Sequence, residues 1–262
     1  MPEVKKHLQG EPCWAELTTS DEKGALKFYM GLFGWTDDAQ SMGDGKFYHM
    51  MEVRGHVAAA LFEAGKDELK QMPPHWSVYF SVTSADETAK KVKAAGGKVV
   101  VEPMDVMDVG RMVVAQDPSV AYISFWEAKR HIGYTVVNEP GAVVWNELMT
   151  RDTKKAVPFY KAVLGVEAAA MPMPGGGDYT MLKVAGKDVA GIMAMPKEVP
   201  AQVPAYWGPY FAVANADAAI KKAQSLGGKA MMPAQDIAGV GRFATLSDPQ
   251  GATFSILQPA QK

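Results

Sequence analysis

Cysteine is almost absent from this chain of 262 residues, because Cys13 is the only one. A single cysteine excludes an internal disulfide and is typical of a protein in a reducing compartment. The formal net charge of −2 gives no basic excess that would attract nucleic acid or an anionic membrane. No stretch reaches the roughly 18 apolar residues of a membrane span, and the N-terminus lacks the apolar run of a signal peptide. We therefore expect a cytoplasmic protein that binds neither nucleic acid nor membrane.

The sequence does contain a long internal repeat. Residues 14–35 read WAELTTSDEKGALKFYMGLFGW, and 131 positions later residues 145–166 read WNELMTRDTKKAVPFYKAVLGV. The same offset aligns further pairs: Tyr48 with Tyr179, Trp76 with Trp207, Gly96-Gly97 with Gly227-Gly228, Gly110-Arg111 with Gly241-Arg242, and Asp117-Pro118 with Asp248-Pro249. A period of this length indicates two duplicated domains rather than an array of small repeats.

The duplication sets the expected domain boundaries. We expect one domain over residues 1–130 and a second over residues 131–262, with residues 127–141 as the segment that joins them. The chain is 48% apolar and 21% charged, which is a normal globular composition. Each half is of ordinary single-domain size, so we expect each half to bury its own core.

Local patterns within the first repeat predict a short series of elements. Residues 12–18 alternate apolar and polar side chains, as a half-buried strand does. Asp21 is placed to cap a helix that Gly34 ends. Two strands follow, at residues 46–53 and 56–63, joined by a tight turn. The first unit is therefore strand, helix, then two or three strands.

The pattern restarts after an expected loop at residues 64–74. A strand, a helix that ends near Ala95, and three more strands are expected, the strands lying near residues 76–82, 98–102, 110–115 and 120–126. Each half then holds two βαβββ modules, which predicts an α+β fold. Pro158 falls inside the second copy of the first helix and removes a backbone hydrogen bond, so we expect a kink or a late start there.

This order of elements resembles the vicinal-oxygen-chelate superfamily, which comprises glyoxalases, bleomycin-resistance proteins and ring-cleaving dioxygenases. The motifs that carry the resemblance are FYMGLFGW at the end of the first helix and a Gly-Arg pair followed by Asp-Pro before the last strand. The stretches RHIGYTVVNEPG and VGRFATLSDPQGA resemble tandem two-domain members. The resemblance covers nearly the whole chain, twice. It implies curled mixed sheets around a cavity and, in the enzymes, a divalent metal in that cavity.

The positions that the resemblance assigns to metal ligands carry no usual ligand. They hold Trp14, Ser77, Tyr79, Ala58, Ala60, Phe62, Tyr122 and Ser124 in the first half, and Trp145, Gly208, Tyr210, Val189, Gly191, Met193, Thr253 and Ser255 in the second. A register error of two residues recovers only Glu16 or Glu147, and one carboxylate does not hold a metal. We therefore expect no cofactor. The alternative is an unusual metal site in the first half made by Glu16, His49 and His75.

The same strand faces predict what remains in the cavities. We expect Trp14, Glu16, Tyr79 and Ser124 to line one cavity, and Trp145, Glu147, Tyr210 and Ser255 to line the other. A carboxylate in an apolar wall has a raised pKa, which suits a general base near neutral pH, so Glu16 and Glu147 are the candidate catalytic residues. The alternative is that each carboxylate is hydrogen-bonded and only orders the cavity floor.

Two arginines near the closing strands are further candidates for ligand binding. Arg111 or Arg242 could hold a carboxylate or phosphate by paired hydrogen bonds. Either could instead tie its own loop through Asp105 or Asp236. Cys13, Trp76 and Trp207 are expected in the core.

Three functions follow from these expectations. The first is a metal-free protein that binds a small organic molecule. The second is a lyase, isomerase or hydroxylase-like enzyme that uses Glu16 or Glu147 as base, or a metal enzyme with an unusual site. The third is an interaction protein whose cavities are filled by side chains. We expect a small-molecule ligand as partner, and a monomer or a homodimer.

Overall fold

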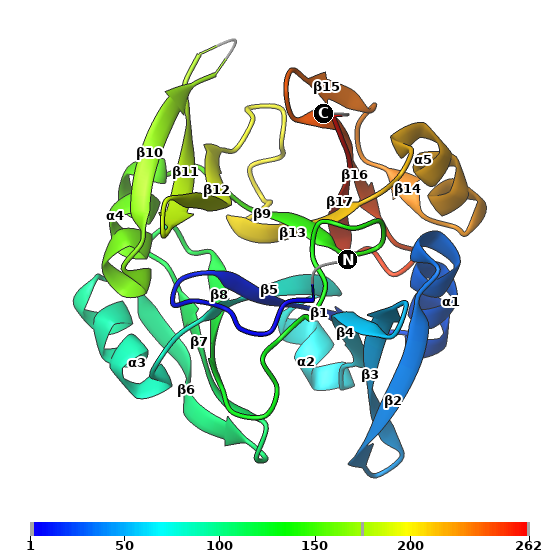
Figure 1. Ribbon diagram of the computed structural model, residues 1–262, viewed down its shortest axis with the longest axis horizontal. Helices are drawn as coiled ribbons and strands as arrows, with labels where there is room; N and C mark the ends of the chain where they lie inside the picture. Colours follow the sequence, from blue (N-terminus) through cyan, green and yellow to red (C-terminus); the bar gives the residue numbers. More distant parts are fainter. Residues whose placement is uncertain (1–2, 174–175, 261–262) are drawn as a thin grey trace.

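The fold consists of two mixed β-sheets and five helices in the part of the chain that the computed structural model describes, residues 3–173 and 176–260 (Figure 1). The first sheet contains β1 (Pro12–Thr19), β2 (Thr36–Gly43), β3 (Lys46–Val53), β4 (His56–Glu63), β5 (His75–Ser81), β6 (Lys98–Val106), β7 (Gly110–Gln116) and β8 (Tyr122–Ala128). The second contains β9 (Val143–Thr150), β10 (Glu167–Pro172), β11 (Asp178–Val184), β12 (Lys187–Ala194), β13 (Tyr206–Ala212), β14 (Lys229–Ala230), β15 (Gln235–Ile237), β16 (Gly241–Ser247) and β17 (Thr253–Pro259). The helices are α1 (Glu22–Phe33), α2 (Lys66–Gln71), α3 (Ala85–Ala94), α4 (Thr153–Leu164) and α5 (Ala216–Ser225).

Each sheet comes from one half of the chain. The strand order of the first sheet is β2-β3-β4-β1-β5-β8-β7-β6, and the second repeats this order from β10 to β14, with β15 paired to β16. The two modules of a half join where β1 runs antiparallel to β5, and β9 antiparallel to β13. The predicted α+β fold of βαβββ modules is confirmed. Within the described residues, none of the helices has both the length and the apolar character of a membrane span.

The helix ends follow from single residues, as predicted. The Asp21 side chain accepts a hydrogen bond from Gly24 N at 3.0 Å, and Gly34 ends α1 in the left-handed region at φ 70°. The helix α4 begins at Thr153, directly after its cap Asp152 and in register with the start of α1. The expected late start of α4 is therefore wrong, because the cap fixes the first turn before the chain reaches Pro158.

A second local prediction is wrong in the segment that precedes β5. Residues 64–74 were expected to form a loop, but residues Lys66–Gln71 form α2. None of the residues of α2 is buried, so its sequence carries no apolar periodicity that would reveal a helix.

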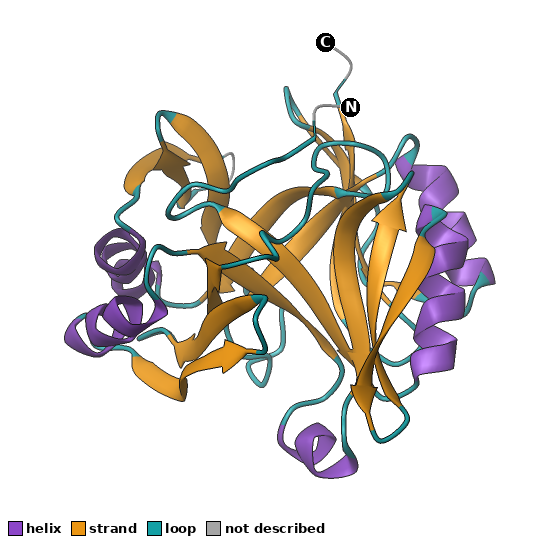
Figure 2. Ribbon diagram, turned by 60° about the horizontal axis from the view of Figure 1, so that its bottom comes forward, coloured by secondary structure: helices purple, strands orange, loops and turns teal. Residues whose placement is uncertain are grey.

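The hydrophobic cores are shared between the halves, which contradicts the expectation that each half buries its own. One core joins α1 and β4 of the first half to α5, β16 and β17 of the second. The other joins α3 and β7 of the first half to α4 and β12 of the second. Figure 2 shows the matching arrangement, with the helices in two pairs on opposite sides of the strands and α2 apart from both. In each core a helix packs on strands of its own half and beside a helix of the other half, α1 beside α5 and α3 beside α4.

Buried hydrogen bonds fix these shared cores. The Tyr29 hydroxyl of α1 donates to Asp248 in the second half at 3.0 Å and accepts from Trp76 Nε1 at 3.0 Å. In the other core the Tyr160 hydroxyl of α4 donates to Asp117 at 2.8 Å and accepts a hydrogen bond from Trp207 Nε1. Trp76, Trp207 and Cys13 are all buried, so their predicted place in the core is confirmed. The predicted domain boundaries at residues 130 and 131 stay predictions.

Candidate functional site

A buried carboxylate held by two tyrosines is the most distinctive polar feature of the second sheet. Both oxygens of Glu147 on β9 accept a hydrogen bond, from the Tyr179 hydroxyl at 2.7 Å and from the Tyr210 hydroxyl at 2.8 Å. Trp145 Nε1 donates to the Tyr179 hydroxyl at 2.8 Å. Each oxygen of Glu147 thus accepts one hydrogen bond, and only 6% of the residue is exposed.

The first sheet carries the same cluster. Glu16 on β1 accepts hydrogen bonds from the hydroxyls of Tyr48, at 2.6 Å, and Tyr79, at 2.9 Å. Trp14 Nε1 donates to the Tyr48 hydroxyl at 2.9 Å. Glu16 is less deeply buried than Glu147. The duplication has preserved the whole hydrogen-bonded group.

Strand pairing explains why four of the predicted residues in each half meet. Trp14 and Glu16 are two positions apart on β1, so both side chains point to the same face. Tyr79 on β5 lies opposite Trp14, and Ser124 on β8 lies opposite Tyr79. In the second half Trp145, Tyr210 and Ser255 are paired in the same way.

Burial sets the electrostatics of the cluster. Removal from water raises the pKa of Glu16 and of Glu147, and the hydrogen bonds from the tyrosines oppose that rise. Burial beside a carboxylate also raises the pKa of Tyr48, Tyr79 and Tyr210 well above the usual value for a phenol. The tyrosines therefore stay protonated near neutral pH and remain hydrogen-bond donors to the acid.

Two members of the cluster, Tyr48 and Tyr179, were not among the predicted site residues. They lie on β3 and β11, and in each sheet another strand separates them from the acid. A small residue on the intervening strand lets the ring cross: a Cβ at Gly191 would overlap the Tyr179 hydroxyl. The signal that could have revealed them is the repeat itself, which aligns these two tyrosines at the same offset as the acids.

The structure does not bring Arg111 or Arg242 to the acid cluster. Strand alternation places Arg111 on the face of β7 that carries the buried Val113, which is the helix-covered face. The Arg111 guanidinium makes paired hydrogen bonds of 2.9 and 3.0 Å to Asp86 of α3 and lies 3.5 Å from Asp105. The contact with Asp105 is the loop tie that was expected as the alternative role of this arginine, and the hydrogen bonds to Asp86 also connect the strand to α3.

Arg242 makes the same tie in the second half. Its guanidinium bonds Asp217 of α5 at 3.0 Å and Asp236 at 2.7 Å. Both arginines therefore connect a helix to a strand on the side of the sheet away from Glu16 and Glu147.

The residues around the acids do not fit the divalent metal that the family resemblance implies. Glu16 is flanked by Ala60 and Ser77 on the neighbouring strands, and both oxygens of its carboxylate are occupied by tyrosines. Glu147 is flanked by two glycines at the equivalent positions. Within residues 3–173 and 176–260, no group of three or more His, Cys, Asp or Glu side chains could hold a metal ion.

The alternative metal site of Glu16, His49 and His75 is not assembled either. His49 Nδ1 lies 2.8 Å from Asp37, and its other nitrogen lies 3.2 Å from Glu22 of α1. Tyr48 points to Glu16, so its neighbour His49 points to the other face of β3. The His75 Nδ1 atom is 2.8 Å from the Pro73 carbonyl.

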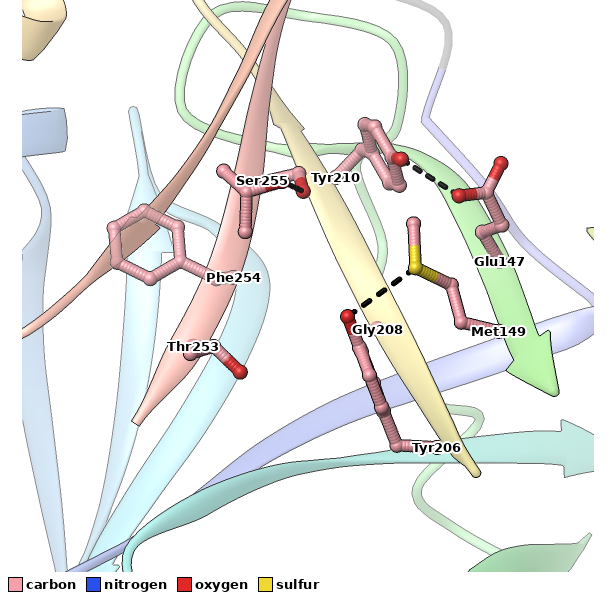
Figure 3. A pocket seen from close by; sticks show the side chains of 9 residues that line it. Glu147, Met149, Tyr206, Gly208, Tyr210, Thr253, Phe254 and Ser255 are labelled. Carbon is pink, nitrogen blue, oxygen red and sulfur yellow. Dashed lines mark hydrogen bonds between the residues drawn. The ribbon is translucent and has the colours of Figure 1, made fainter. Parts of the chain in front are cut away.

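A small cavity borders the acid cluster of the second half (Figure 3). Its volume is about 10 Å³, which is room for about one water molecule. The wall combines polar and apolar groups: Glu147, Met149, Tyr206, Gly208, Tyr210, Thr245, Thr253, Phe254 and Ser255. The Tyr206 hydroxyl contacts the Met149 sulfur at 3.3 Å and closes one side.

Sequence and structure comparisons agree on the family. The profile of the glyoxalase/bleomycin resistance protein/dioxygenase superfamily matches residues 12–125 and again residues 141–256. The chain is 42% identical over 261 residues to "Putative glyoxylase CFP32" of Mycobacterium tuberculosis, covering 99% of both chains. It is 34% identical to "Anthracycline biosynthesis protein DnrV" of Streptomyces peucetius, covering 97% of this chain and 95% of that protein.

Two solved structures illustrate the likeness of fold. The Mn(II)-bound glyoxalase of Novosphingobium aromaticivorans superposes with a TM-score of 0.64 at 15% identity, covering 96% of this chain and 84% of that one. The 2,3-dioxygenase LapB of Pseudomonas sp. KL28 gives a TM-score of 0.66 at 13% identity, covering 96% and 92%. Because the sequence identity is so low, these structures show a shared fold and nothing more. The chain belongs to the glyoxalase/bleomycin resistance protein/dioxygenase superfamily, as a tandem member with two such domains.

Proposed function

We propose that this protein binds a small organic molecule, without a metal ion, in the cavity beside Glu147. The observation that carries the proposal is the Glu147 carboxylate, which is buried next to a small cavity and held by the Tyr179 and Tyr210 hydroxyls. A buried acid with fixed donors beside a partly apolar wall is the kind of site that orients a small ligand.

The lining favours a hydroxylated, flat ligand. Glu147 can accept a hydrogen bond from a ligand hydroxyl, and the hydroxyls of Thr245 and Ser255, 3.1 Å apart, can donate or accept. Met149 and Tyr206 offer polarisable and aromatic surface to a ring. The relative named for anthracycline biosynthesis supports the same class, hydroxylated polycyclic aromatic compounds.

A flat aromatic ligand requires the cavity to open, because the present space holds about one water molecule. Tyr206 is the side chain best placed to move. It is partly exposed, and its hydroxyl is held by a single contact to the Met149 sulfur. The loop before it is held by Arg151, the residue after β9, whose guanidinium donates to the carbonyls of Pro200 and Val203.

Quenching of tryptophan fluorescence by 1,8-dihydroxyanthraquinone tests the proposal, since Trp145 belongs to the cluster. We expect saturable binding to the wild-type protein. Glu147→Gln removes a charged acceptor and should weaken binding by about 10-fold or more. The matched Glu16→Gln change in the other half should leave affinity within about 2-fold, because Glu16 lies on the other sheet. Equal affinity in both variants would overturn the assignment to this cavity.

A second candidate function is acid–base catalysis at the same site. Burial raises the pKa of Glu147, so its carboxylate is a stronger base than a solvated carboxylate. The reaction class would be a lyase or isomerase step on the bound molecule, which needs no oxidant, with Glu147 as the base and Tyr210 as the orienting donor. Glu16 would be the base if the first half is the catalytic one.

Mass spectrometry of the incubated ligand separates binding from catalysis. An enzyme would convert the compound, and Glu147→Gln would stop conversion by more than about 100-fold while the protein stays folded. A pure binding protein would return the compound unchanged. Failure of both binding and conversion with every hydroxylated aromatic probe would favour an interaction protein with filled cavities.

A further inference from the structure

A groove of about 310 Å³ lies between α1 and α5, and none of its lining residues belongs to an acid cluster. These two helices come from different halves and lie side by side in Figure 1. The groove is lined mainly by apolar groups, with one lysine at its edge: Leu32, Phe33, Pro140, Gly141, Ala212, Val213, Ala214, Asn215, Ala218, Ala219 and Lys222. Its volume is at the lower end of the range for small-molecule sites.

Because of the duplication, the chain contains an equivalent region between α3 and α4, here called the first copy, and the groove is the second copy. In the first copy Gly10 N donates to Ser81 O at 2.8 Å, and in the second copy Gly141 N donates to Ala212 O at 2.8 Å. The 131-residue offset of the repeat relates both pairs. The backbone therefore follows the same path in the two copies.

The side chain of Gln9 occupies the first copy. Its amide Nε2 donates to the Leu164 carbonyl at the end of α4, at 3.2 Å. Its Oε1 accepts from Thr83 N, just before α3, at 2.7 Å. One carboxamide therefore bridges a carbonyl at a helix end and a backbone N–H.

The second copy keeps the two backbone groups and lacks the carboxamide. Position 140, equivalent to Gln9, is a proline. A Cβ at Gly141 would lie 3.2 Å from the Phe33 carbonyl, as one at Gly10 would lie 3.3 Å from Leu164 O, so the spacing is retained. Among the described residues, the Phe33 carbonyl and Ala214 N form no hydrogen bond that corresponds to those made by Gln9.

We propose that this groove binds a small molecule bearing a primary carboxamide or a lactam. The ligand N–H would donate to the Phe33 carbonyl, and its C=O would accept from Ala214 N, as Gln9 does in the other copy. The apolar body of the ligand would lie on Leu32 and Val213. This site is separate from Glu147 and does not depend on the proposed function.

Titration of benzamide into ¹⁵N-labelled protein, followed by two-dimensional NMR, tests the site. We expect saturable shifts of the Ala214 and Asn215 amide signals. N,N-dimethylbenzamide keeps the ring and the carbonyl but cannot donate, so it should bind at least 5-fold more weakly. Equal affinity for the two probes would overturn the proposal, and this comparison needs no variant.

Two variants use the repeat as an internal control. Pro140→Gln should place a carboxamide in the groove and abolish the benzamide shifts at Ala214. Gln9→Ala should open the first copy and add a second set of shifts at Thr83. Glu147→Gln should change neither result, which distinguishes failure here from failure of the Glu147 proposal. Unchanged benzamide binding by a folded Pro140→Gln protein would contradict the assignment.

Discussion

The two halves of the molecule keep the same acid cluster but surround it differently. Glu16 and Glu147 each accept hydrogen bonds from two tyrosines. In the second half the cavity beside the acid is lined by Met149 and Tyr206, where the first half has Thr18 and His75. The duplicated structure therefore holds the acid in the same place in both halves, while the side chains beside it differ.

The largest expected effect concerns the cores that the halves share. The Phe28 ring of α1 lies 2.7 Å from where a Cβ at Gly228 would stand, and the Phe159 ring of α4 lies 2.6 Å from the same point at Gly97. Each ring therefore packs on the other half. Phe28→Ala or Phe159→Ala should lower the free energy of unfolding by about 3–5 kcal/mol, measured by urea denaturation.

The number of transitions in the unfolding curve then tests whether the two halves share their cores. Because each core contains both halves, either substitution should shift one cooperative transition for the whole protein. Two separate transitions, with only the half that carries the substitution shifted, would show that the halves are stable independently.

A smaller effect is expected at the tyrosines, and it should differ between the halves. Tyr210→Phe removes a donor from the buried Glu147 carboxylate, which should cost about 1–3 kcal/mol. The equivalent change Tyr79→Phe should cost less, because water can reach the more exposed Glu16. Urea denaturation of both variants measures the difference, and an equal or reversed order would contradict the comparison of burial.

The smallest effect is the pH dependence of stability. Burial raises the pKa of both acids in the folded state, so the folded protein binds these protons more tightly than the unfolded chain does. The stability linked to them is present below pH 4.5, the ordinary pKa, and is lost as the pH rises through the folded pKa. The effect is small because the tyrosine hydrogen bonds offset part of the burial penalty.

A variant with both Glu16→Gln and Glu147→Gln isolates this dependence. Glutamine does not titrate, so the stability of the variant relative to the wild type should increase from pH 4 to pH 8. Thermal denaturation across this range measures the trend. A constant or decreasing difference would mean that the acids are not destabilised as anions by burial.

Much of the fold could be predicted because its signals are local. The predicted strands at residues 46–53 and 56–63 coincide with β3 and β4, and the turn between them needs only its own residues. The helix caps at Asp21 and Gly34 are likewise set by single side chains and one left-handed backbone conformation. Such features do not depend on what packs against them.

The sharing of the cores could not be read from the sequence. The two copies of a helix, such as α1 and α4, have nearly the same apolar periodicity, so the pattern does not say which helix of the other half packs beside which. The position of Tyr48 beside Glu16 was hidden for a similar reason, since β4 lies between their strands. Both facts depend on the curvature of the sheets and on contacts between distant residues.

Isothermal titration calorimetry of chelator-treated protein with 1,8-dihydroxyanthraquinone shows whether the site beside Glu147 binds this ligand without a metal ion. We expect binding at one site per chain, unchanged by prior treatment with EDTA and weakened about 10-fold or more by Glu147→Gln. Binding that disappears with the chelator and returns only with a stoichiometric divalent metal would contradict it.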